Sequence, residues 1–163
     1  MFTFSRLVLL ICLNVFLIPV IGLAKGSEGA AIWKTFAYGV NPKTGEFSTE
    51  LSNLIGKTVR IPGFMIPMEE KGDKVYEFLL TPDRGSCIHV PPPPPHLIFY
   101  VVMPKNQPAS FDWGPIWIEG TLQKAKKKSH ISGEFMDGEL DVDSVFMIDG
   151  NSVKPYVFSM PKN

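Results

Sequence analysis

Five consecutive prolines, Pro91 to Pro95, constrain this chain more than any other stretch. Proline has no backbone N–H and fixes φ at about −65°, so the run favours polyproline II and cannot pair as an interior strand. We therefore expect a stiff arm at the surface or at the margin of a sheet. Such an arm loses little conformational entropy when it binds a partner.

Residues with metal-binding and nucleophilic side chains flank the prolines. Cys87 and His89 precede them and His96 follows. In an extended chain, residues two apart share a face, so Cys87 and His89 point the same way. Thiolate and imidazole are ligands that suit zinc and copper(I). The candidate metal ligands are therefore Cys87, His89 and His96, with His130 as a remote fourth.

Two other interpretations of this stretch stay open. Cys87 can be a nucleophile activated by His89, which would make the protein a thiol enzyme. Alternatively, Cys87 and His89 are structural, and Pro91, Pro92, Pro93, Pro94 and Pro95 form a docking surface for the aromatic residues of a partner. The sequence shows neither an orienting group nor an oxyanion site. We therefore expect a binding protein rather than an enzyme.

The N-terminus has the pattern of a secretory signal peptide. Arg6 precedes an almost wholly apolar run, and Gly22 and Ala24 are small residues suited to signal peptidase. We predict cleavage after Ala24 and a periplasmic location, with membrane attachment only if the segment is retained. Cys12 would leave with it, so Cys87 would be a lone thiol in an oxidising compartment.

Length and charge limit the remaining organisation. We expect a lead-in segment at 25–50, with a short helix at Ala30–Tyr38, and one domain at 51–163. Trp33 is expected to anchor the lead-in onto the domain. The formal net charge is zero, which gives no indication of nucleic-acid binding.

The domain shows a period of two, which predicts strands. Thr58–Ile61 alternates, Pro62 and Gly63 mark a bend, and Phe64–Ile66 continues the strand. Pro67 to Asp73 is expected to be a polar connection. Further strands are expected at Lys74–Leu80, Leu97–Met103, Pro115–Leu122, Ser144–Ile148 and Val153–Phe158, the last two around a turn at Asp149–Asn151. The predicted fold is mainly β: a small OB-like barrel, whose long first strand coils through both halves, behind a short N-terminal helical lead-in.

Two charged stretches have simpler explanations. The lysines of Lys124–Lys128 favour a solvated tip near a strand end. The alternating acidic residues from Asp137 to Asp143 lack the spacing of a calcium loop and favour a solvated strand face or loop.

Two motifs together resemble a family of exported bacterial proteins classed only as a domain of unknown function. The first is Gly56–Pro67, with a Gly-Lys-x-Val…Gly-Phe-Met-x-Pro pattern, and the second is the Cys-x-His-Val-Pro run at Gly85–Pro95. The resemblance implies a periplasmic or membrane-attached protein associated with ABC-type transport systems, in some cases near metal uptake genes. The partner it implies is an envelope protein or transporter component. Members usually have Asn where this chain has His96.

Overall fold

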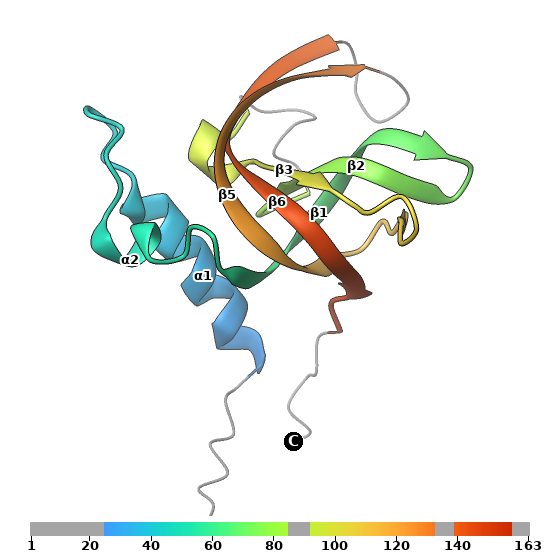
Figure 1. Cartoon of the computed structure of the whole chain (residues 1–163), viewed down its shortest axis with the longest axis horizontal. Coiled ribbons are helices and arrows are strands. Elements are labelled where there is room, and N and C mark those ends of the chain that lie inside the picture. The colour runs from blue at the N-terminus through green and yellow to red at the C-terminus, as the bar shows by residue number, and fades with distance from the viewer. Residues whose placement is uncertain (1–24, 85–91, 133–138, 158–163) are drawn as a thin grey trace, which may run out of the picture.

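The computed structural model describes residues 25–84, 92–132 and 139–157, and it is mainly β (Figure 1). Two helices lead into a set of strands, with one 3-10 turn between the second and third strands. In chain order the elements are α1 (Lys25–Gly39), α2 (Thr49–Ser52), β1 (Thr58–Lys71), β2 (Lys74–Thr81), η1 (Pro95–Leu97), β3 (Phe99–Val102), β4 (Ala109–Ser110), β5 (Ile116–Ser132) and β6 (Glu139–Pro155).

Five of the strands close into a barrel. They pair in the order β1-β5-β6-β3-β2, and β2 pairs again with β1, while β4 adds a short pairing to β2. The β3–β6 pair is parallel, and the other pairs described are antiparallel. This closed Greek-key arrangement confirms the predicted small OB-like barrel with a short helical lead-in.

The first strand bends where the sequence predicts it. Thr58–Gly63 pairs with β5, and from Phe64 onward β1 pairs with β2. A Cβ on Gly63 would lie 2.6 Å from the carbonyl oxygen of Thr81, so only glycine lets the two strands approach this closely at the bend. The long first strand therefore serves both halves of the barrel.

The expected polar connection after Ile66 is much shorter than predicted. Pro67 pairs with Phe78, and the ladder continues to Lys71, so the connection is reduced to Gly72 and Asp73. Gly72 has φ of 66°, the left-handed conformation that a tight hairpin turn requires. Proline at position 67 is tolerated because the ladder has a register shift directly after it.

The last two predicted strands are one strand. β6 runs without a break past Asp149–Asn151, where the sequence indicated a turn. Glu119 pairs with Ser152 while Gly120 pairs with Gly150, so the extra residue is taken up as a β-bulge instead. β5 likewise continues beyond Leu122 to Ser132, so Lys124–Lys128 lies within a strand and not at its tip.

The lead-in helix α1 fills one end of the barrel. Phe36 is fully buried, and its ring meets those of Phe99 and Phe146 edge-on, with centroids 4.7 and 5.3 Å apart. Trp33 packs against Phe99 and donates a 2.7 Å hydrogen bond from Nε1 to the carbonyl oxygen of Pro62. The prediction that Trp33 anchors the lead-in onto the domain is confirmed.

The chain is still helical where the predicted domain, 51–163, begins. Thr49–Ser52 is a short helix, capped by the Ser48 hydroxyl, which accepts a hydrogen bond from the amide of Leu51. The side chain of Leu51 is buried in the main core with Phe36. The Ser48 cap and the burial of Leu51 therefore stabilise a helical turn before β1.

A second apolar cluster lies outside the barrel. Leu80 belongs to the main core, whereas its neighbour Leu79 faces outward and is nevertheless fully buried. Leu79 and Ile98 cluster with Ile131 of β5 and Val142 of β6. The far ends of β5 and β6 arch over the barrel in Figure 1, and their apolar face covers this outer surface.

Candidate functional site

Part of the predicted site lies outside the described residues. This applies to Cys87, His89 and Pro91, which fall within 85–91. The proposed pairing of the thiol with the first imidazole therefore stays a prediction. The structure does place both ends of the segment and the remaining prolines, Pro92–Pro95, which we call the arm.

The upstream end of the segment reaches the loop between β4 and β5. After β2, the hydroxyl of Thr81 donates a 2.9 Å hydrogen bond to the carbonyl oxygen of Asp83. The guanidinium carbon of Arg84 lies 5.6 Å from the ring centroid of Trp113, which also contacts Phe111 edge-on. Trp113 is 60% exposed, although aromatic residues of this size are usually covered.

The arm itself is at the surface. Pro92, Pro94 and Pro95 are exposed and Pro93 is half-buried. Pro94 has φ −52° and ψ 146°, close to polyproline II as the sequence predicts. The chain then turns into η1, where the amide of Leu97 donates a 2.8 Å hydrogen bond to the carbonyl oxygen of Pro94.

The downstream end of the arm is fixed by the core. Leu97 packs against the main core, and Ile98 is 1% exposed in the second cluster. A proline run whose end is held by buried side chains has few conformations available to it. The arm is therefore both exposed and restrained.

His96 lies at the foot of the arm and is half-buried. Burial removes water from the imidazole and lowers its pKa below the ordinary 6.5. The neutral ring that this favours is the form that binds metal ions. Within the described ranges, however, no three His, Cys, Asp or Glu side chains are grouped in a way that could hold a metal ion.

A cleft of about 330 Å³ adjoins the arm. Its walls are Pro95 of the arm, a lysine-rich part of β5 and a short piece of β6. The lining residues are Pro95, Lys126, Lys127, Lys128, Asp143, Ser144 and Val145. We call this the lysine cleft.

A β-bulge shapes the lysine cleft. Lys124 pairs with Phe146 and Lys127 with Ser144, so two residues of β5 oppose Val145 alone. Bulges of this kind bend a strand and redirect its side chains, often beside binding sites. Here the bulge places Lys126 next to the end of the arm. The sequence indicated only a lysine run, because a bulge in a ladder depends on the partner strand.

Tyr100 connects β5 to the outer surface of the barrel. Its hydroxyl donates a hydrogen bond to the carboxylate of Glu77, and the ammonium of Lys127 lies 5.2 Å from its ring centroid. Burial, followed by the hydrogen bond to Glu77 and the negative charges of Glu77 and Glu69, raises the pKa of Tyr100 to about 12. The phenol is therefore a hydrogen-bond donor, and it holds the Glu77 side chain in place.

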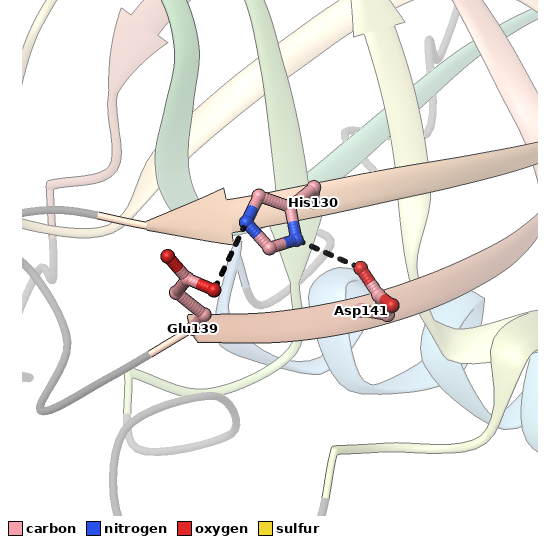
Figure 2. A network of polar contacts seen from close by, with 3 residues as sticks. All are labelled: His130, Glu139 and Asp141. Atoms are coloured by element: carbon pink, nitrogen blue, oxygen red, sulfur yellow. Dashed lines mark hydrogen bonds and ion pairs between the residues drawn. The ribbon is translucent and has the colours of Figure 1, made fainter.

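His130 faces two carboxylates near the far end of the β5–β6 hairpin (Figure 2). Its Nδ1 lies 2.8 Å from Oδ1 of Asp141, and its Nε2 lies 3.8 Å from Oε2 of Glu139. All three side chains are largely exposed. The hydrogen bond to Asp141 is the main cause that raises the pKa of His130; desolvation opposes it, and the negative charges of Asp141 and Glu139 add to the rise.

The acidic stretch is a solvated strand face where the structure describes it, as predicted. Glu139, Asp141 and Asp143 are exposed on β6. The sequence alone does not predict that this stretch lies beside His130, because that contact depends on the pairing of β5 with β6. The signal available was the opposite charge of the two segments on either side of Gly133 and Gly138.

No helix among the described residues combines the length and apolar character needed to cross a membrane. The predicted signal peptide, 1–24, lies outside those residues and stays a prediction.

Comparison with known proteins gives a family without an assigned activity. No protein with a curated description is significantly similar to the chain. The crystal structure of a DUF3299 family protein from Pseudomonas aeruginosa PAO1 is similar, with 26% identity and a TM-score of 0.52 over 82% of this chain and 83% of that one. The family match covers residues 41–147. The chain therefore belongs to the DUF3299 family, proteins of unknown function.

Proposed function

We propose that this protein is an exported accessory protein of the cell envelope, which binds a partner protein through the arm. The observation that carries the proposal is the combination of exposure and restraint at Pro92–Pro95. Three of the four prolines are exposed, while the next residues are held by the core. The proposal includes a periplasmic location and a role in binding rather than catalysis.

The chemistry of the arm defines the contact. Polyproline II segments dock into grooves lined by aromatic side chains, because their shape is already formed before binding. The entropy lost on association is correspondingly small. An envelope transport component is the partner we favour, in keeping with the transport association implied by the sequence resemblance.

Crosslinking in intact cells tests this proposal. An epitope-tagged chain is crosslinked in the envelope, and the partner is identified and then quantified with Pro92→Ala/Pro94→Ala. We expect recovery of the partner to fall by about tenfold or more, as for a central contact worth about 1.4 kcal/mol. Pro42→Ala, an exposed proline in a turn far from the arm in sequence, is the matched control and should leave recovery unchanged.

The result that would overturn the proposal is equal recovery with the wild type and the double variant. Both variants should keep the unfolding free energy within about 0.5 kcal/mol, because the substituted prolines are exposed. A loss of partner without a loss of stability therefore reports on binding.

A second candidate function is zinc or copper(I) binding, and the half-buried His96 favours it. Burial lowers the pKa of this imidazole, which favours the neutral form that binds metal ions. In the sequence it follows the segment that carries Cys87 and His89. Titration of the purified mature protein with zinc or copper(I) measures this directly. Stoichiometric binding that is lost in Cys87→Ser and weakened in His96→Asn is the expected result, and absence of binding would exclude it.

A further inference from the structure

The lysine cleft is continuous with the arm and carries an excess of positive charge. Pro95 belongs to both surfaces, so a molecule that covers the arm also reaches the cleft. Three lysines and one acidic residue, Asp143, are among the residues that line it. Pro95 and Val145 together form an apolar wall of the cleft.

Among the described residues, no acidic side chain forms an ion pair with the lysines of the lysine cleft. Across the part of the chain that the structure describes, the ion pairs are those of His130 with Glu139 and Asp141. Asp143 lies opposite Lys128 in the ladder but forms no ion pair with it there. Lys127 leans over the ring of Tyr100, which leaves Lys126 and Lys128 with exposed side chains beside the arm.

We propose that the partner's groove carries acidic side chains next to its aromatic ones, and that a carboxylate of the partner enters the lysine cleft. This inference rests on the proposed function and adds the chemistry of the partner. The apolar wall accepts the stem of a glutamate, and the ammonium groups of Lys126 and Lys128 pair with its head. A polyproline run can bind a groove in either of two orientations. Charge complementarity at one end of the arm favours one of them.

Binding of two defined peptides tests the inference. One peptide alternates glutamate with tryptophan, and the other alternates glutamine with tryptophan. NMR titration of the full mature chain should show binding of the acidic peptide at least about tenfold tighter, with shifts at Lys126–Lys128 and Ser144. Raising the salt from about 50 mM to about 300 mM should weaken it, because exposed charges are screened over shorter distances.

Variants then assign the effect to the cleft. Lys126→Gln/Lys128→Gln should bind the acidic peptide about 5- to 20-fold more weakly, which corresponds to two exposed ion pairs. Asp143→Asn should bind it about two- to threefold more tightly, because a repulsive charge is removed. Lys57→Gln/Lys154→Gln removes the same charge elsewhere on the barrel and should stay within about twofold of the wild type.

Equal binding of the two peptides, absence of binding by both, or unchanged affinity in Lys126→Gln/Lys128→Gln would overturn the inference. The crosslinking experiment separates this failure from failure of the proposed function. If Pro92→Ala/Pro94→Ala loses the envelope partner while Lys126→Gln/Lys128→Gln retains it fully, the arm binds a partner whose groove is not acidic.

Discussion

The indole Nε1 of Trp33 lies 2.7 Å from the carbonyl oxygen of Pro62 and donates a hydrogen bond to it. Pro62 comes directly before Gly63, where β1 leaves β5 and joins β2. The lead-in helix is thus fastened to the bend of the barrel. The same helix passes so close that a Cβ on Gly29 would lie 2.7 Å from Cγ of Pro62.

Replacing Trp33 with phenylalanine should lower the stability of the fold while an aromatic ring still fills the position. The ring still packs against Phe36 and Phe99, but the carbonyl oxygen of Pro62 loses its donor. We expect the free energy of unfolding to fall by about 1–2 kcal/mol, measured by urea denaturation. Tyr38→Phe, on the same helix but 84% exposed, should change it by less than about 0.5 kcal/mol. Equal midpoints for Trp33→Phe and the wild type would show that the hydrogen bond contributes nothing.

The sequence predicts this anchor but not its partner. A tryptophan that shares a helix face with Ile32 and Phe36 is best explained by packing, whereas the atom that accepts its proton depends on how the chain folds back. The bend at Pro62–Gly63 was predictable because proline and glycine interrupt a clear alternation. Together with the several short strands that have Gly and Pro at their corners, this bend indicates an OB-like barrel.

The long β5–β6 hairpin was not predictable in the same way. Bulges at Gly120 and at Lys124–Lys127 shift the period of two, and lysines occupy both faces of β5 where it leaves the barrel. The lysine cleft was not predictable from the sequence either, because it forms only when Lys127 pairs with Ser144. Exposure of the arm, in contrast, follows from the prolines themselves, which cannot join a ladder.

Adding a methyl group at Gly120 should disrupt the bulge that makes β6 continuous. A Cβ there would lie 2.4 Å from the carbonyl oxygen of Asp149 and 2.6 Å from Cγ2 of Ile148. Because backbone must move to relieve the first contact, we expect Gly120→Ala to lower the unfolding free energy by about 1–3 kcal/mol. Thermal unfolding followed by circular dichroism measures it.

Gly114→Ala is the matched control for this substitution. Its nearest neighbour would be Oδ1 of Asp112 at 3.2 Å, a side-chain atom that accepts a 2.8 Å hydrogen bond from the Gly114 amide and needs to shift only by a few tenths of an ångström. We expect a change of less than about 1 kcal/mol. If both variants unfold at the same temperature, the close approach at Gly120 does not matter for stability.

Two buried serines should be dispensable for stability. Ser129 is 7% exposed and Ser144 is 2% exposed, and neither hydroxyl has a hydrogen-bond partner in the portion described. A buried hydroxyl without a partner costs free energy, so alanine should leave stability unchanged or raise it by about 1 kcal/mol per site. Thr81→Val is the contrast, because the buried hydroxyl of Thr81 donates to Asp83 and its loss should cost about 1 kcal/mol. Destabilisation of Ser144→Ala by as much as Thr81→Val would contradict this account.

The His130 ring should titrate above its ordinary pKa of 6.5 and His96 below it, which NMR of the imidazole protons can resolve in one experiment. The raised pKa of His130 means that its interactions stabilise the folded chain fully below pH 6.5 and that this contribution is lost as the pH rises through the raised value. For His96 the sign is opposite: its burial destabilises the fold as the pH falls below 6.5, because the unfolded chain takes up a proton that the buried ring resists.

Asp141→Asn removes the main cause of the upward shift and should bring the pKa of His130 back toward 6.5, while Glu139→Gln, whose carboxylate is 3.8 Å away, should lower it less. Protection of the β5–β6 backbone amides from hydrogen exchange should fall more in Asp141→Asn than in Glu139→Gln. An unshifted His130 in the wild type, or an equal effect of both substitutions, would mean that the contact with Asp141 does not persist in solution.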